Sequence, residues 1–297
     1  MFSSVVDFSA RIYYNSIVMR TIDTKEIENA VYRLAIKACT GITEPCKKAL
    51  IKAREVETSP ACAFALDTVL KNGEIANSLQ MPVCQDTGLA CVLLEIGQNV
   101  SLIGAPLSDA VNEGVRRAYK DGSFRFSVCD PLTRENTGDN TPAVIHTEIV
   151  SGDRVNITFL PKGFGSENMS RIFMLTPKNG VNGVIDAVVE TVRLAGSKPC
   201  PPVMVGVGIG GSFDLAAFLS KKALAREVGT HNQREDVAEI ERVALDRINE
   251  LKIGAQGFGG EVTAIGVNCE IAPTHIAGLP VAVNIQCHCV RVEKESL

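Results

Sequence analysis

The sequence predicts an α+β fold, in which an N-terminal helical region precedes mixed helices and sheets. Three observations support it: helical periodicity dominates residues 23–79, strand patterns recur from residue 90 onward, and no regular alternation of a doubly wound sheet follows. A chain of 297 residues can bury a sizeable core without disulfides. We expect one catalytic domain over residues 19–297. Residues 1–18 look like an extension outside the fold, with Met19 as an alternative start.

The N-terminal region is predicted to contain three helices. From Asp23, apolar residues recur at helical spacing until Gly41 ends the run. A second helix begins after Thr43 and a third after Ser59, because each capping residue is followed by a proline in the first turn.

The remaining chain alternates irregularly between strand and helix patterns. We expect strands at 90–96, 143–150, 154–161, 202–209, 262–269 and 280–286, and helices at 108–120, 181–194, 215–226 and 235–251. The Ser-Gly-Asp turn after residue 150 predicts that 143–150 and 154–161 form a hairpin, and the helix at 108–120 is expected to be capped.

Composition excludes several classes of protein. The net charge of −4 gives no basic surface for nucleic acid, and no apolar run approaches the roughly 18 residues of a membrane span. Ten cysteines without a secretory signal indicate metal binding or catalysis rather than disulfides, so we expect a cytoplasmic protein. No C-x-x-C pair occurs, which argues against a zinc finger or ribbon.

Three cysteines, Cys84, Cys200 and Cys287, fall at strand boundaries where loops can converge. Three thiolates suit a [4Fe–4S] cluster whose fourth iron stays open to act as a Lewis acid, although loop cysteines can also be incidental. Five others lie in apolar patterns and are predicted to be core residues: Cys39, Cys46, Cys62, Cys91 and Cys269. Cys129 and Cys289 fit either group.

Five segments carry a resemblance. They are "PVCQDTG" (82–88), "RFSVCDPLTRENTGDNTP" (125–142), "PKGFGSENMS" (161–170), "KPCPPVMVGVGIGGSFD" (198–214) and "PTHIAGLPVAVNIQC" (273–287). In this order they resemble the α subunit, or N-terminal half, of the iron–sulfur hydro-lyases, the class I fumarase and L-tartrate dehydratase family. The resemblance covers nearly everything from residue 19 to residue 291.

The resemblance implies a set of cluster ligands and substrate contacts. Cys84, Cys200 and Cys287 match the cysteines that hold the family's [4Fe–4S] cluster, which has one iron without a cysteine ligand. Gln85 is implied to contact substrate, and Asp86 to join the proton chemistry.

Three further residues match family positions outside the cysteine loops. His275, twelve residues before Cys287, is implied to lie beside the substrate hydroxyl, whereas a lone histidine is more often structural. Arg125 resembles the arginine that grips a substrate carboxylate, against the alternative of a surface charge. Gly165 is implied to bring a backbone amide to a carboxylate, although Phe164 replaces a glycine of the family pattern.

The activity implied is reversible hydration and dehydration of a small dicarboxylate, with fumarate to malate as the leading case. L-tartrate dehydration is the alternative, and a methylated relative such as mesaconate also fits. The family's carbon base and further carboxylate contacts come from its β half. We therefore expect a separate β subunit, an active site at the interface, a heterotetramer, and little turnover by this chain alone.

A glycine run supports a different class of function. Gly206, Gly208 and Gly211 fit the dinucleotide fingerprint of a nucleotide-binding oxidoreductase. Against it, the first glycine lies inside the predicted strand, two helices follow, and the expected acid about 20 residues on is missing. We interpret the glycines as sites of close backbone packing near Cys200. A non-catalytic iron–sulfur or zinc-binding subunit is a third alternative.

Overall fold

The computed structural model describes residues 19–297, and the expectation for residues 1–18 lies outside this range. The three predicted N-terminal helices are confirmed: α1 (Thr24–Cys39), α2 (Glu44–Val56) and α3 (Pro60–Leu79). Each starts at its expected cap, because the side chains of Asp23, Thr43 and Ser59 accept hydrogen bonds from first-turn amides. Two short strands that the sequence did not reveal, β1 (Arg20–Asp23) and β3 (Val100–Ile103), pair in parallel.

The first four-stranded sheet has the order β10-β5-β2-β4. Its strands are β2 (Leu89–Gly97), β4 (Val144–Val150), β5 (Val155–Lys162) and β10 (Glu293–Ser296). The predicted hairpin of β4 and β5 is wrong, because β2 lies between them, parallel to β4 and antiparallel to β5. The turn instead crosses the end of β2, where the amide of Asn99 donates to the Gly152 carbonyl at 2.9 Å.

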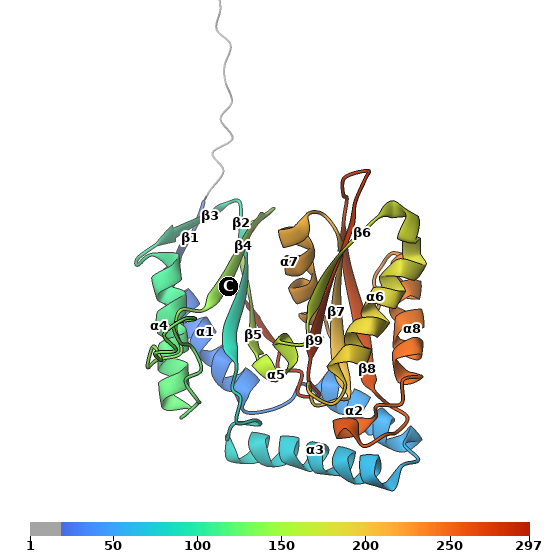
Figure 1. Cartoon of the computed structure of the whole chain (residues 1–297). Helices are drawn as coiled ribbons and strands as arrows, with labels where there is room; N and C mark the ends of the chain where they lie inside the picture. Colours follow the sequence, from blue (N-terminus) through green and yellow to red (C-terminus); the bar gives the residue numbers. More distant parts are fainter. Residues whose placement is uncertain (1–18) are drawn as a thin grey trace, which may run out of the picture.

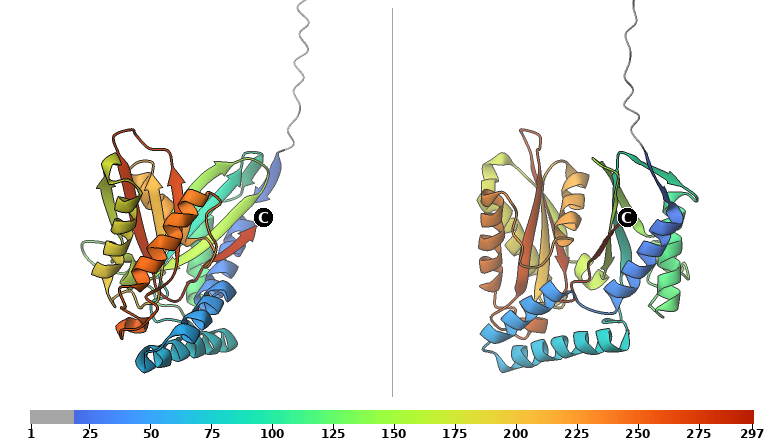
Figure 2. Two further views of the ribbon diagram at one scale, coloured as in Figure 1. Left: turned by 90° about the vertical axis from the view of Figure 1, so that its right-hand side faces the viewer. Right: turned by 180° about the vertical axis from the view of Figure 1, so that it is seen from behind.

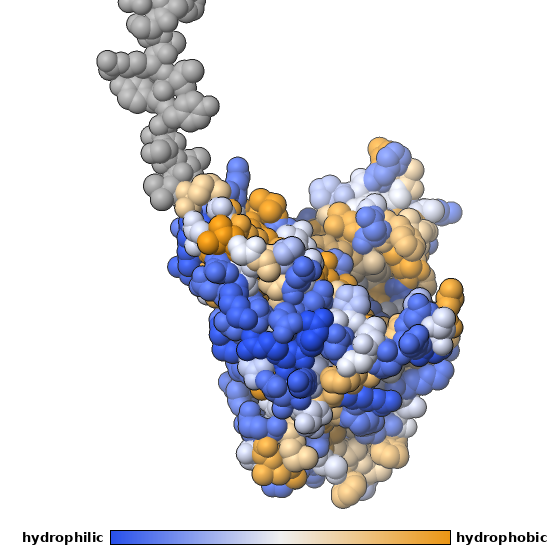
Figure 3. Space-filling model, turned by 90° about the vertical axis from the view of Figure 1, so that its left-hand side faces the viewer, coloured by the Kyte–Doolittle hydropathy of each residue, from blue (hydrophilic) through white to orange (hydrophobic). Residues whose placement is uncertain are grey.

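Two helices cover the outer face of this sheet. α4 (Leu107–Asp121) packs on α1, which in turn packs on β5. The expected cap of α4 is wrong, since its N-cap residue is Pro106 and no side chain accepts from its first turn. Viewed from this side, the middle of the molecule is mainly hydrophilic, with apolar residues towards the upper and lower ends (Figure 3).

The second four-stranded sheet has the order β6-β9-β7-β8. Its strands are β6 (Arg171–Leu175), β7 (Val203–Gly210), β8 (Ala264–Ala272) and β9 (Leu279–Gln286). Its helices are α6 (Gly180–Ala195), α7 (Phe213–Leu224) and α8 (Glu235–Asn249), all three as predicted. In this sheet too, β7 is central, parallel to β8 and antiparallel to β9.

Helix α7 lies between the two sheets, whereas α6 and α8 cover the far side of the second sheet (Figures 1 and 2). The Phe218 ring of α7 stacks on His146 of β4 at 4.8 Å between ring centroids. Next to it, the Lys222 ammonium pairs with Glu148 of β4 at 2.6 Å. Helix α3 runs below both sheets, and α2 lies below the second sheet (Figure 1). The observed mixture of helices and sheets confirms the α+β prediction.

Candidate active site

Four loops meet at one edge of the two sheets. In the first sheet β2 begins where β5 ends, since Leu89 pairs with Lys162. In the second sheet β7 begins where β9 ends, since Met204 pairs with Gln286. The Lys162 ammonium donates to the Ile285 carbonyl at 2.8 Å and so links the two edges directly. The loops at 84–88, 163–167, 200–202 and 287–291 therefore converge below the sheets.

The loop that carries Cys84 and Asp86 is held firmly on both sides. The amide of Val83 donates to the Cys39 carbonyl at 2.9 Å. The Asp86 carboxylate accepts from the Gly88 amide at 3.0 Å and from the Phe164 amide at 2.8 Å. Phe164 begins the four-residue helix α5 (Phe164–Glu167), whose first amides have no partners within the helix. The carboxylate is thus fixed between two loops that are far apart in the sequence.

Gly88 makes this turn possible, and its replacement gives a direct test. Its φ of +86° lies in the left-handed region, and a Cβ there would lie 2.8 Å from the Lys162 backbone nitrogen.

Gly229 provides the control for this replacement, because it has φ +84° with nothing within 4 Å of its Cβ position. We expect Gly229→Ala to cost about 1–2 kcal/mol of unfolding free energy from backbone strain alone. Gly88→Ala should cost more, because β2 and β5 must also move apart. Urea unfolding of both variants measures this, and equal losses would show that the close approach is unimportant.

The three predicted cluster ligands lie together. Cys84 and Cys287 pack against the same small apolar cluster. The carbonyl of Cys200 accepts from the amide of His288, the residue after Cys287, at 3.3 Å. Burial raises the pKa of the Cys200 thiol, and the nearby sulfur atoms of Cys287 and Cys84 raise it further. Three loops from three parts of the sequence therefore present sulfur atoms to one place.

The other cysteines behave as predicted from their patterns. The five core cysteines, Cys39, Cys46, Cys62, Cys91 and Cys269, are all buried. Of the two left open, Cys289 is buried against Cys84 and Cys287, whereas Cys129 is half-buried and pairs through its backbone with Asn136. The sequence therefore separated the five core cysteines from the three loop cysteines, none of which is fully buried.

The chemistry of the donor set fits an iron–sulfur cluster, whose usual protein ligands are cysteine thiolates. Within residues 19–297, no three His, Cys, Asp or Glu side chains are close enough to one another to hold one metal ion. In an iron–sulfur cluster each thiolate binds a different iron, so the ligands surround a common centre without meeting at one atom. Cys200 is exposed and Cys84 and Cys287 are half-buried, so the three thiols are accessible from the same edge.

Three predicted substrate contacts border the cysteines. The Thr87 hydroxyl donates to the Arg125 carbonyl at 3.0 Å, and the exposed Arg125 side chain has no ion pair in the described part of the chain. The Cβ position of Gly165 lies 3.7 Å from the carbonyl oxygen of Lys198, two residues before Cys200. The thiol of Cys84 donates to the Gln85 side chain at 3.7 Å.

His275 is not brought to this group within one chain. It lies in the exposed loop 273–278, which joins the end of β8 to the start of β9. The Thr274 hydroxyl donates to the Gly211 carbonyl at 2.8 Å, next to the end of β7. Because Cys200 precedes β7, the eight residues of this strand separate His275 from the cysteines, about 25 Å at 3.3 Å per residue.

Several residues that support the site were not identified from the sequence. Arg291 is only 1% exposed and donates to the Asp86 carbonyl at 2.9 Å. The fully buried Asn140 donates to the Gly88 carbonyl at 3.2 Å. This hydrogen bond gives the polar stretch "ENTGDN" (135–140), part of the segment 125–142, a structural role. Burial lowers the pKa of Lys162 to about 8, against the opposing effect of Glu167, 3.2 Å away. For Arg291, the one signal available in the sequence was a charged residue inside the apolar stretch "CVRV" (289–292).

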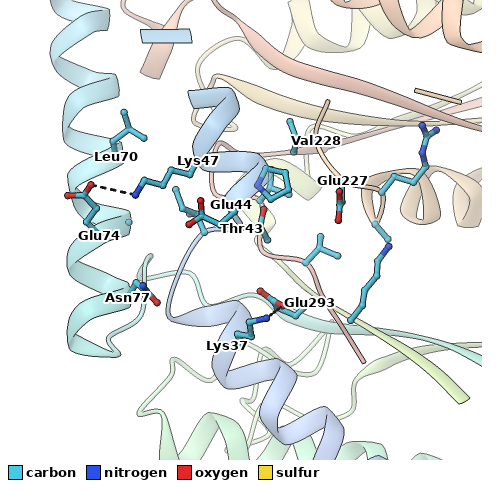
Figure 4. A pocket seen from close by; sticks show the side chains of 18 residues that line it. Lys37, Thr43, Glu44, Lys47, Leu70, Glu74, Asn77, Glu227, Val228 and Glu293 are labelled. Atoms are coloured by element: carbon cyan, nitrogen blue, oxygen red, sulfur yellow. Dashed lines mark ion pairs between the residues drawn. The ribbon is translucent and has the colours of Figure 1, made fainter. Parts of the chain in front are cut away.

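A separate cavity of about 570 Å³ contains none of the predicted site residues. It lies between α2, α3 and the segments around Val228 and Glu293 (Figure 4). Its charged side chains largely satisfy one another, as in the Lys37–Glu293 pair at 2.6 Å and the Lys47–Glu74 pair at 3.7 Å. The candidate site is instead an open edge formed by loops.

Residues 28–295 match the model of the family described as "Fumarate hydratase (Fumerase)". The chain belongs to this family. It is 41% identical over 268 residues to the "Putative L(+)-tartrate dehydratase subunit alpha" of Methanocaldococcus jannaschii, covering 88% of this chain and 94% of that protein. It is 32% identical over 238 residues to the "L(+)-tartrate dehydratase subunit alpha" of Escherichia coli (strain K12), covering 79% of this chain and 78% of that one. The "Putative fumarate hydratase class I" of Geobacillus stearothermophilus is 27% identical over 277 residues, which cover 89% of this chain and 53% of that protein.

The Fumerase match includes all four loops of the candidate site. Members of this family are hydro-lyases, so the chain belongs to the enzymes that add or remove water. Class I fumarate hydratases depend on iron–sulfur chemistry, which agrees with the thiol-rich edge. Among the described helices of this Fumerase chain, none combines the length and apolar character needed to cross a membrane.

The glycine run of this family member has a packing role. A Cβ at Gly206 would collide with the Ser220 carbonyl of α7, and one at Gly208 with the Ala216 carbonyl. Both glycines lie within β7, so they let the helix approach the strand closely rather than forming a loop after it. The close packing predicted from the sequence therefore agrees with the geometry, but its partner is α7 rather than the backbone near Cys200.

Proposed function

We propose that the chain is the cluster-binding α subunit of a hydro-lyase that reversibly hydrates a small dicarboxylate, with fumarate to malate as the leading reaction. The convergence of Cys84, Cys200 and Cys287 beside Asp86, in a member of the Fumerase family, is the observation that carries this proposal. The three thiolates would hold a [4Fe–4S] cluster with one iron free of cysteine. When bound, the cluster supplies a Lewis acid at that iron.

The protein's own groups would orient the substrate and move the hydroxyl proton. Two backbone amides fix the Asp86 carboxylate, so it is preorganised to accept or return a proton. The Gly165 amide, in the first turn of α5, has no acceptor in the described part of the chain and can donate to a carboxylate. Gln85 is exposed beside Cys84 and can donate to the same ligand.

Arg125 is proposed to bind one substrate carboxylate through its guanidinium fork. Arg125→Met should raise KM about 10- to 100-fold with a smaller effect on kcat, because a hydrogen bond to a charged group is worth about 1.5–3 kcal/mol. Arg125→Lys should recover part of the loss. Arg154 is exposed just before the start of β5, whereas the candidate site lies at the end of this strand. Arg154→Met is therefore the matched control. Steady-state kinetics of the assembled enzyme measures the effect, and an unchanged KM in Arg125→Met would remove this role.

We further propose that a β subunit covers the open edge. Both tartrate dehydratase relatives are named as α subunits, and the fumarate hydratase relative extends well beyond the matched region. Cys200, Gln85 and Arg125 are exposed, so substrate would not be enclosed by this chain alone. The β subunit would supply the base for the carbon proton, in a heterotetramer located in the cytoplasm. Because the length of β7 separates His275 from the cysteines of its own chain, His275 could contribute to this active site only from a second chain.

L-tartrate is the second candidate substrate, favoured by the 41% identity to a relative named for it. The test is anaerobic co-purification with the β subunit, followed by assays with fumarate, L-malate, L-tartrate and mesaconate. We expect turnover by the complex and almost none by this chain alone. Full activity of the chain alone would overturn the proposal of a β subunit. A cluster-loaded complex that is inactive on fumarate, L-malate, L-tartrate and mesaconate would overturn the proposed function. Nicotinamide binding by a chain that takes up no iron would favour the oxidoreductase instead.

A further inference from the structure

Arg291 carries a buried positive charge that forms no direct ion pair within residues 19–297. It is 1% exposed and lies four residues after Cys287. One guanidinium nitrogen donates to the Asp86 backbone carbonyl, but Nε has no partner in residues 19–297. No carboxylate of the described chain forms an ion pair with it. A buried, unpaired charge is costly, so its presence here indicates that a negative partner is missing.

The surroundings of Arg291 show where that partner would sit. Burial by itself lowers the pKa of Arg291, and the sulfur atoms of neighbouring cysteines, Cys287 and Cys39 foremost, outweigh burial and raise it. Cys289 and Cys84 act in the same direction. Cys84, Cys287 and Cys289 also pack in one cluster. Its hydrogen bond to the Asp86 carbonyl, two residues after Cys84, and its place four residues after Cys287 put the guanidinium beside the loops of two predicted cluster ligands.

We infer that Arg291 is the fixed counter-charge of the iron–sulfur cluster, an inference that rests on the proposed function. Metal binding requires the cysteines as thiolates, and when Cys84, Cys200 and Cys287 are loaded their negative charges exceed the positive charge of the cluster core at this edge. A guanidinium held in place by the Asp86 carbonyl compensates them at short range. The same contact ties the cluster's charge balance to the backbone of Asp86.

Two consequences follow for the loaded protein. Without Arg291 the cluster should be lost about 10- to 100-fold faster, the ratio expected for removing a charged interaction in a buried site. Reduction adds a further negative charge to the cluster, which a nearby positive charge favours. Removing that charge should therefore lower the reduction potential of the cluster.

The experiment compares three variants of the full chain, reconstituted anaerobically with iron and sulfide. Arg291→Met removes the charge but keeps an unbranched side chain, and Arg291→Lys keeps the charge but loses the fork. Arg193 lies on the exposed face of α6, so Arg193→Met controls for net charge. Three measurements apply to each: the rate of iron release to a chelator, the reduction potential by EPR-monitored titration, and the Tm of the metal-free chain.

We expect fast iron release and a lowered potential in Arg291→Met, values near wild type in Arg291→Lys, and no change in Arg193→Met. Wild-type release and potential in Arg291→Met would overturn the inference. So would equal impairment of both Arg291 variants together with an equal fall in metal-free Tm, because that pattern indicates packing alone. If Arg291→Met does not fold, an impaired cluster in the folded Arg291→Lys decides against charge compensation. A wild-type chain that binds no cluster refutes the proposed function itself.

Discussion

Cys84→Ser, Cys200→Ser and Cys287→Ser are each expected to abolish stable cluster binding and to reduce turnover of the assembled enzyme below detection. A hydroxyl is a far weaker ligand for iron than a thiolate, and an iron that loses its only protein ligand is easily released. Iron and sulfide content, with the visible absorbance of the anaerobic protein, measures the loss.

Two other cysteines provide matched controls for these ligand variants. Cys129 is half-buried like Cys84 but lies outside the converging loops, and Cys62 is fully buried in the first turn of α3. Cys129→Ser and Cys62→Ser should keep the cluster, although the buried hydroxyl of the second should reduce stability. Retention of a complete cluster by Cys200→Ser would show that another group is the ligand.

Asp86→Asn has the second-largest expected effect, a fall of about 10²- to 10⁴-fold in kcat, the usual contribution of a positioned acid or base. The side chain keeps its size, so the contacts with the Gly88 and Phe164 amides are only partly lost. The cluster should remain, since Asp86 is not a ligand in this account.

Cluster content separates this role of Asp86 from a structural one. Iron should be equal in wild type and Asp86→Asn, and KM should change less than kcat. If kcat falls only in proportion to a loss of iron, Asp86 holds the loop in place rather than moving protons. Wild-type kcat with a full cluster would exclude Asp86 from the chemistry.

Local signals predicted most of the helices. Asp23, Thr43 and Ser59 each combine a capping side chain with a helical pattern behind it, and all three helices begin there. Strand pairing was predicted less well, because it depends on segments that are far apart in the sequence. A turn between 143–150 and 154–161 reads as a hairpin, but the buried strand β2 pairs with both neighbours and separates them. The short strands β1, β3 and β10 depend on partners far away in sequence, so they carry little pattern of their own.

The site residues in loops could be predicted from the sequence, whereas the buried residues that hold those loops in place could not. Cys84, Cys200 and Cys287 were singled out by their place at strand boundaries and lie together in the fold. Arg291 was missed because a lone arginine in a strand-like stretch resembles a surface charge. The place of His275 could not be foreseen, since it depends on β8 and β9 both flanking β7, which puts their connecting loop at the far end of the sheet.

The most direct test of the account is anaerobic reconstitution of the chain with iron and sulfide, followed by Mössbauer spectroscopy. We predict one cluster of about four irons per chain, three of them equivalent in thiolate ligation and one distinct and selectively removable. Failure to take up iron, or four irons with equivalent thiolate ligation, would contradict the three-cysteine cluster on which the proposed chemistry depends.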